Sequence, residues 1–165
     1  MMEHILIKNV LSNKERKKLI KDSQQFLMDG DEMGKMVNKS ITWPGKQTLE
    51  HMYLLPSFGP IIYRMLNLIK ESLKEDLIVT YAWINWTNGK KEDLCWHDHP
   101  SYYSAVYYMQ TFPFFSNGTL FEDGLVKAPQ NSILVFPSRL QHTAPSSPLR
   151  FERYTMALEL EKYNV

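Results

Sequence analysis

The hydrophobic pattern of this chain changes its period once, near Leu77. Before that point apolar residues recur at helical spacing, whereas after it they follow the two-residue period of extended strands. The strands predicted after Leu77 are short, are separated by turn residues and have no helix between them. They cover residues 77–86, 103–110, 119–121, 132–136 and 153–161. Such a series is typical of an antiparallel sandwich or barrel.

The part of the chain before residue 77 predicts two helices. Ser12 and Glu15 match a capping box, so a helix is expected from Asn13 to about Met28. Pro60 suits the first turn of a second helix, whose apolar residues lie on one face. These residues are Ile61, Ile62, Met65, Leu66, Ile69 and Leu73. We expect both helices to pack against a sheet.

Together these patterns predict an α+β protein that is mainly β. Residues 1–76 would supply the helical support, with an edge strand over residues 3–10 and a loop or irregular hairpin over residues 30–50. Residues 77–165 would form the β core of the same single domain. A length of 165 residues agrees with this, since it leaves no room for two full cores.

The composition argues against several classes of protein. With 19 Lys+Arg against 18 Asp+Glu, the net charge is +1, which does not suit a protein that grips duplex nucleic acid through many phosphates. The single cysteine, Cys95, cannot form an internal disulfide, and we expect it to be a small buried residue. The sequence shows neither a signal-peptide pattern nor a membrane-spanning apolar run. We therefore expect a cytoplasmic protein.

The histidines carry the first chemical signal. His97 and His99 are two residues apart, so on extended backbone both imidazoles point to the same face. A third ligand has to come from elsewhere, and His142 is the only other histidine in the β half of the sequence. Imidazole ligands suit iron, copper, nickel or zinc. This pattern predicts one transition-metal site held by the three histidines.

Arg153 and Tyr108 carry a second signal. Arg153 opens the last predicted strand, and an arginine that faces the interior of a barrel is costly unless it meets a carboxylate. Tyr108 shares one strand face with Ser104 and Val106, so its phenol is placed to donate to the same anion. A metal beside a carboxylate-binding pair is the site that an oxo-acid cosubstrate needs.

With these motifs the sequence resembles the iron- and 2-oxoglutarate-dependent oxygenases, especially the prolyl-hydroxylase-like branch and its uncharacterised bacterial and viral relatives. The similarity covers residues 81–160, about half of the chain, and its motifs follow the order of the family. They are residues 97–100 (HDHP), 104–109 (SAVYYM), 118–121 (GTLF) and 129–137 (PQNSILVFP), followed by His142 and Arg153. The order and spacing of the motifs, more than any single one, carry the resemblance.

The resemblance implies a jelly-roll fold, the cupin-like double-stranded β-helix. It implies Fe(II) held by His97, His99 and His142, and it implies 2-oxoglutarate as the cosubstrate that chelates the iron. The distal carboxylate of 2-oxoglutarate would meet Arg153 and Tyr108. The implied reaction is the hydroxylation of a substrate with release of succinate and CO2.

One position departs from the pattern of the family. The usual first motif is His-x-Asp/Glu, whose carboxylate completes a two-histidine, one-carboxylate triad. Here histidine occupies position 99, and Asp98 lies between the two histidines. The two-residue spacing favours His99 as the middle ligand, with Asp98 as the alternative if the backbone turns sharply before Pro100.

Two further functions stay open beside the oxygenase. One is a cupin-like metal dioxygenase that uses three histidines and no 2-oxoglutarate, and the other is a jelly-roll binding module with a degenerate metal site. Tyr102 and Tyr103 follow the metal segment and are the best-placed aromatic residues for the rim of a substrate opening. The prime substrate stays open between a peptide, a nucleobase and a small metabolite.

Overall fold

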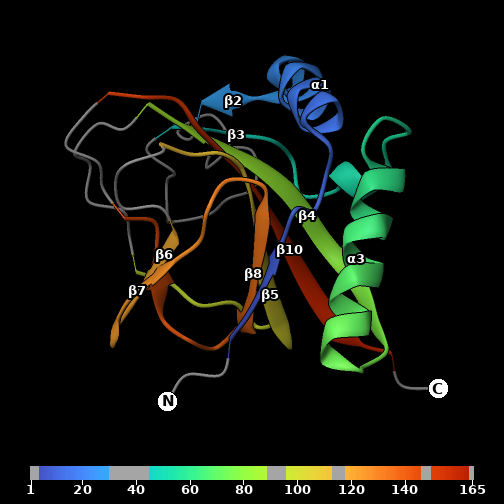
Figure 1. Cartoon of the computed structure of the whole chain (residues 1–165), viewed down its shortest axis with the longest axis vertical. Helices are drawn as coiled ribbons and strands as arrows, with labels where there is room; N and C mark the ends of the chain where they lie inside the picture. The colour runs from blue at the N-terminus through green and yellow to red at the C-terminus, as the bar shows by residue number, and fades with distance from the viewer. Residues whose placement is uncertain (1–3, 30–44, 89–95, 113–117, 146–149, 164–165) are drawn as a thin grey trace.

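The computed structural model describes residues 4–29, 45–88, 96–112, 118–145 and 150–163. The strands in these segments are β1 (Ile5–Lys8), β2 (Met28–Asp29), β3 (Lys46–Gln47), β4 (Leu77–Thr87), β5 (Tyr103–Gln110), β6 (Gly118–Phe121), β7 (Gly124–Lys127), β8 (Ser132–Pro137), β9 (His142–Thr143) and β10 (Arg153–Lys162). As described, they form a seven-stranded antiparallel sheet in the order β1-β8-β5-β10-β4-β3-β2 and a three-stranded sheet in the order β7-β6-β9. Figure 1 shows the smaller sheet on one side of the larger sheet.

The helices cover the other face of the larger sheet (Figure 1). The α-helices are α1 (Asn13–Ser23) and α3 (Gly59–Leu73), and short 3-10 turns follow or precede them at Gln24–Phe26 and Met52–Leu54. Ile62, Met65 and Ile69 of α3 are fully buried against the sheet. Burial of such side chains contributes roughly 1.5–3 kcal/mol each, so this layer is a main source of stability.

The side chains of β10 divide between the two faces of the larger sheet. Tyr154, Met156, Leu158 and Leu160 belong to the apolar core under the helices. The alternate residues Arg153, Thr155, Ala157 and Glu159 line a pocket on the opposite face. The two-residue period of a strand thus gives one face to the core and leaves the other face, between the sheets, for chemistry.

Most elements predicted from the sequence are present in the structure. The five strands predicted after Leu77 are β4, β5, β6, β8 and β10, with bounds that differ by one residue at most. β1 lies at the edge of the larger sheet, as expected, and pairs with β8. The second helix begins at Gly59 with Pro60 in its first turn. In the first helix the capping box of Ser12 and Glu15 is formed.

Two features of the structure differ from the sequence predictions, and one agrees with them. The first helix ends at Ser23 rather than near Met28, because the chain tightens into a 3-10 turn and then extends into β2. β2 and β3, which lie on either side of residues 30–44, pair with each other, in agreement with the irregular hairpin expected over residues 30–50. β7 and β9 were not predicted. Both are short, and β9 pairs only with β6, so local pattern alone gives little signal for them.

Some expectations fall on residues outside those described. These are the burial of Cys95 and the middle of segment 30–50. Among the described helices, none combines the length and the apolar character that crossing a bilayer requires.

Candidate metal centre

A pocket of about 290 Å³ lies between the two sheets. Its walls come from β3, β4, β5 and β10 of the larger sheet and from β6 and β9 of the smaller one. The volume lies near the lower end of the range of roughly 300–1,000 Å³ that is usual for small-molecule sites. The pocket is therefore suited to a ligand of modest size.

His97, His99 and His142 converge at this pocket. One potential ligand atom from each imidazole lies within 4.8 Å of the other two. The ring centroids are 4.5 Å apart for His97 and His142, 5.0 Å for His97 and His99, and 5.4 Å for His99 and His142. Three imidazoles at this separation are able to hold one transition-metal ion.

The backbone around His97 and His99 explains why these two side chains share a face. His97 and His142 exchange backbone hydrogen bonds, with N–O distances of 3.1 and 2.9 Å, and form an antiparallel bridge beside β9. The amide of His99 donates to the carbonyl of Ser138 at 3.0 Å. The segment is therefore held in extended backbone against its neighbours, and residues two apart point the same way.

Asp98, the alternative middle residue, does not join the histidine cluster. Its side chain lines the pocket but is exposed, and it is not one of the three residues whose ligand atoms converge.

The ring of His142 is oriented by a neighbouring carbonyl. Its Nδ1 lies 2.7 Å from the carbonyl oxygen of Leu140, so the Nδ1–H donates there and leaves Nε2 with the lone pair. Burial lowers the pKa of His142 to about 4, which keeps the imidazole neutral near neutral pH. A neutral imidazole with a fixed tautomer is the form that binds a metal.

The ring of His99 is oriented by a carboxylate. Its Nδ1 lies 2.7 Å from Oε1 of Glu159, and these side chains are 17% and 9% exposed. The sequence prediction missed Glu159. The signal for it was its place on the final strand, six residues after Arg153 and hence on the same face.

Arg153 lies buried in the same pocket at 7% exposure. Its Nη2 donates to the carbonyl of Gly118 at 3.2 Å, while its Nε has no hydrogen-bond partner among the described residues. No carboxylate in the described part of the chain pairs with it. Burial without an anionic partner lowers the pKa of the guanidinium, so this cation lies where an anionic ligand would stabilise it.

Tyr108 reaches the pocket through Thr119. Its ring lies 5.8 Å from the guanidinium carbon of Arg153, and its hydroxyl is 2.6 Å from the Thr119 hydroxyl. The ring is fully buried in the apolar cluster between the sheets, whereas Thr119 lines the pocket. Burial raises the pKa of Tyr108 to about 12, so the phenol stays protonated.

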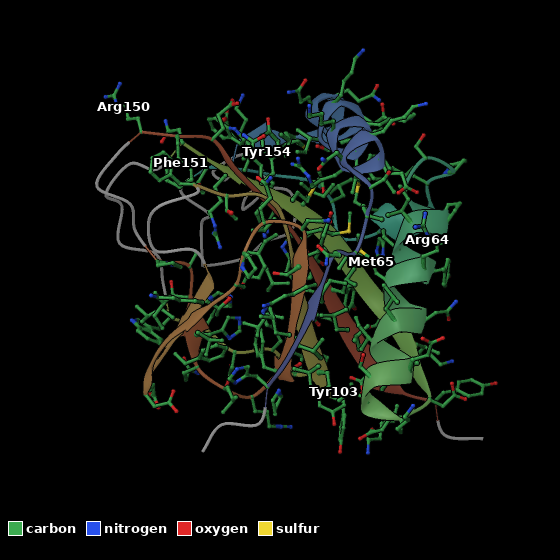
Figure 2. All side chains as sticks on the ribbon, viewed as in Figure 1. Arg64, Met65, Tyr103, Arg150, Phe151 and Tyr154 are labelled. Atoms are coloured by element: carbon green, nitrogen blue, oxygen red, sulfur yellow. The ribbon has the colours of Figure 1, made fainter. Side chains whose placement is uncertain are left out.

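Tyr102 and Tyr103 do not line the pocket. The Tyr103 phenol donates to Glu75 at 3.0 Å, beside the C-terminal end of α3, where Figure 2 shows its side chain. The ring of Tyr102 is 46% exposed and lies under the ammonium of Lys162, 4.2 Å from its centroid.

Other residues form the pocket wall on β3 and β4. The ring centroid of Trp83 lies 5.7 Å from that of His99, and Gln47 donates to Asn85 at 2.8 Å. Trp83, Gln47 and Asn85 all line the pocket. β3 and β4 pair with Gln47 opposite Asn85, which explains the hydrogen bond between these two side chains. The sequence had not marked Gln47 or Asn85 as site residues.

No family model matches the sequence, and no curated protein matches it either. Solved structures do match. HygX from Streptomyces hygroscopicus, with nickel and 2-oxoglutarate bound, has 11% identity and a TM-score of 0.67, and the match covers 98% of this chain and 83% of HygX. The viral collagen prolyl hydroxylase vCPH from Paramecium Bursaria Chlorella virus-1 has 12% identity and a TM-score of 0.66, covering 98% and 90%. EctD from S. alaskensis, with bound Fe, has 10% identity and a TM-score of 0.70, covering 98% and 73%.

These neighbours are Fe/2-oxoglutarate-dependent oxygenases, and they share the jelly-roll fold. The predicted fold, a double-stranded β-helix supported by N-terminal helices, is thereby confirmed. At such low identity the likeness concerns the fold, so the chemistry has to be argued from the residues of this chain.

Proposed function

We propose that this protein is a non-haem Fe(II)- and 2-oxoglutarate-dependent oxygenase that hydroxylates a substrate and releases succinate and CO2. The observation that carries the proposal is the composition of one pocket. Three converging imidazoles and a buried guanidinium line the same cavity, and among the described residues no carboxylate pairs with that guanidinium. The first group suits a transition metal, and the second suits the carboxylate of an oxo acid.

The residues present fit Fe(II). His97, His99 and His142 would hold the ion, and two of these rings already donate from Nδ1 to an oxygen acceptor, which leaves Nε2 for the metal. Iron loaded with 2-oxoglutarate would couple the oxidative decarboxylation of the oxo acid by O2 to hydroxylation of the substrate. Nickel- and iron-bound neighbours of the same fold support this assignment.

The residues also fit 2-oxoglutarate. The free Nε–H of Arg153 is available to a carboxylate, and a guanidinium binds such a group in a fork. Thr119 is the second contact that we propose, with Tyr108 acting through it by the hydroxyl–hydroxyl bond of 2.6 Å. Arg153 thereby gains the anionic partner that its burial requires.

The two alternatives explain less of the pocket. A three-histidine dioxygenase that uses no 2-oxoglutarate has no need for a buried arginine whose Nε lacks a hydrogen-bond partner among the described residues. A degenerate binding module has no need for convergent histidines with fixed tautomers. A peptide, a nucleobase and a small metabolite remain the classes of prime substrate to be screened, and the amides of Gln47 and Asn85 are their first polar contacts on the wall.

The experiment is an anaerobic titration of the Fe(II)-loaded protein with 2-oxoglutarate, followed by visible absorption. We expect a metal-to-ligand charge-transfer band. In Arg153→Ala the Kd for 2-oxoglutarate should rise about 10- to 100-fold, because a charge-assisted hydrogen bond is lost, while Fe(II) still binds. His142→Ala should lose the band altogether.

Arg150→Ala is the matched control. Arg150 is exposed and points away from the body of the protein in Figure 2, so its loss should leave the titration unchanged. The absence of a band in the unmodified protein would contradict the proposal. A band without any dependence on Arg153 would favour a different cosubstrate position.

A further inference from the structure

We propose that Glu159 is a positioning residue of the metal centre. It accepts a hydrogen bond from Nδ1–H of His99, which directs Nε2 of that ring to the metal, and it supplies beside the metal the negative charge that a His-x-His motif lacks. The inference rests on the proposed function insofar as it takes the three histidines to be metal ligands. It goes further by assigning a role to a residue outside the ligand set.

The contact between the two side chains is short and enclosed. Oε1 of Glu159 lies 2.7 Å from Nδ1 of His99, and only 9% of the Glu159 side chain is exposed. In the described part of the chain neither lysine nor arginine pairs with Glu159, so the imidazole of His99 is the group that hydrogen-bonds its carboxylate. A carboxylate at this depth needs such a hydrogen bond, because desolvation is costly for an unpaired anion.

The strand places Glu159 correctly for this role. On β10 it pairs with Ser104 of β5 and Tyr81 of β4, near the middle of the larger sheet rather than at its edge. It shares the pocket face with Arg153, which lies at the start of the same strand. One strand therefore carries an anion close to the histidines and a cation further along the same pocket.

His142 and His99 are both oriented through Nδ1, but their hydrogen-bond acceptors differ in charge. His142 also uses Nδ1, but its acceptor is the neutral carbonyl of Leu140. Of these two rings, His99 is the one whose acceptor is charged. A carboxylate acceptor raises the basicity of a metal-bound imidazole, and it does so without occupying a coordination position.

The charge of the whole centre follows from this arrangement. Three neutral imidazoles around a divalent ion leave one more unit of positive charge than two imidazoles and one carboxylate. Glu159 in contact with His99 restores that balance from outside the ligand set. Asp98 also lines the pocket, but it is exposed and not among the convergent ligand residues, so solvent screens its charge more than that of the buried Glu159.

The test compares Glu159→Gln, Glu159→Ala and Asp98→Asn by anaerobic titration of the full-length apo protein with Fe(II), and with Co(II) as a spectroscopic probe. Glutamine keeps an oxygen acceptor and removes the charge, whereas alanine removes both. We expect the Kd for the metal to rise about 10- to 100-fold in Glu159→Ala, with Glu159→Gln between that variant and the unmodified protein. Asp98→Asn should stay within about twofold.

A melting curve of each apo variant separates positioning from general stability. If Glu159 only ties β10 to the histidine segment, Glu159→Ala would melt earlier but its folded form would bind metal with unchanged Kd and unchanged Co(II) bands. That result would overturn the inference, as would a larger loss of affinity in Asp98→Asn than in Glu159→Ala.

The failure of this inference can be told apart from failure of the proposed function. If the unmodified protein binds no metal, both are wrong. If it binds Fe(II) and forms the band with 2-oxoglutarate while both Glu159 variants bind metal normally, only the role of Glu159 is wrong. Should the alanine variant not fold, the near-isosteric Glu159→Gln still decides the role of the charge.

Discussion

Tyr108 is linked to the pocket by a hydrogen bond with Thr119. Thr119 lines the pocket and Tyr108 is fully buried, with 2.6 Å between their hydroxyl oxygens. The sequence pattern had placed Tyr108 on the correct strand face but could not show that β6 would bring a threonine between it and the pocket. Tyr108 and Thr119 lie on strands of different sheets, and the alternation within one strand does not report which strand of another sheet it meets.

At this residue scale we predict different effects for two isosteric changes. Thr119→Val should raise the Kd for 2-oxoglutarate about tenfold, because a hydrogen bond to a carboxylate is lost. Tyr108→Phe should have a smaller effect on that Kd but lower the free energy of unfolding by roughly 1–2 kcal/mol. Titration of metal-loaded variants and denaturant unfolding measure the two quantities. A larger effect of Tyr108→Phe on the Kd would mean that the phenol itself contacts the ligand.

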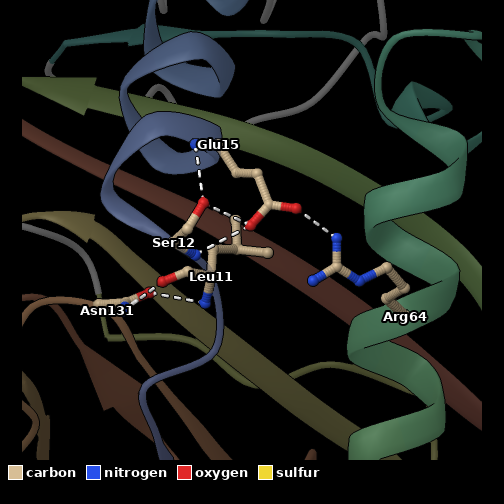
Figure 3. A network of polar contacts seen from close by, with 5 residues as sticks. All are labelled: Leu11, Ser12, Glu15, Arg64 and Asn131. Carbon is tan, nitrogen blue, oxygen red and sulfur yellow. Dashed lines mark hydrogen bonds and ion pairs between the residues drawn. The ribbon is translucent and has the colours of Figure 1, made fainter.

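Hydrogen bonds and an ion pair connect the first turn of helix α1 to the rest of the molecule. Glu15 accepts from the backbone amide of Ser12 at 2.9 Å and also pairs with Arg64 of α3 (Figure 3). Leu11, the residue before Ser12, is held by the side chain of Asn131. The Leu11 amide donates to Oδ1 of Asn131 at 3.0 Å, and Nδ2 of Asn131 donates to the Leu11 carbonyl at 2.7 Å. The capping box was readable from sequence, whereas Arg64 and Asn131 were not, because they are far away along the chain.

At the scale of this element we predict a pH-dependent effect of Glu15→Gln. The hydrogen bond from Arg64, and then those from Ser12, lower the pKa of Glu15 to about 2 from an ordinary 4.5. The stabilisation by its carboxylate is therefore complete above about pH 4.5 and is lost as the pH falls toward 2. At pH 7 the variant should melt below the unmodified protein, but only by a few degrees at most because the carboxylate is exposed.

Melting curves of both proteins between pH 2 and pH 7 measure this effect. The difference in Tm should narrow as the pH falls below about 4.5, and it should shrink in high salt because the pair is exposed. Glu71→Gln, on the exposed side of α3, is the control and should show no such trend. A difference that is constant with pH would mean that the carboxylate charge of Glu15 is not what stabilises α1.

In the whole molecule, the helix-covered core and the candidate site lie on opposite faces of the larger sheet. The helices cover one face of the larger sheet, and the histidines, Arg153 and Glu159 gather on the other, between the sheets. The fold is thus supported from the side away from the pocket. Ligands that bind in the pocket should therefore raise the free energy of unfolding without disturbing the apolar core.

At this scale we predict that metal and 2-oxoglutarate raise the melting temperature together. Ligand at 100 times its Kd stabilises the folded state by about 2.7 kcal/mol, which corresponds to roughly 5–10 °C for a chain of this size. Differential scanning fluorimetry under anaerobic conditions measures the shift. His142→Ala should show no shift with either ligand, and Arg153→Ala should respond to metal alone. Equal shifts in all three proteins would place the binding outside this pocket.

The sequence by itself determined the local elements and the candidate ligands. Periodicity located five strands of the β half and the second helix. It also assigned His97 and His99 to one face and Arg153 to the start of β10, because side-chain direction in a strand depends only on the alternation of the backbone. Such alternation states which way a residue points, but not what it meets.

The tertiary structure alone decided what those residues meet. Pairing between β6 and β9 and the bridge at His97 brought the three histidines together, and the position of β10 beside β5 brought Glu159 to His99. The same long-range packing set Tyr103 against Glu75 instead of at the pocket. These contacts join residues far apart in sequence, and their free energy comes from the packing of whole sheets, which no local pattern contains.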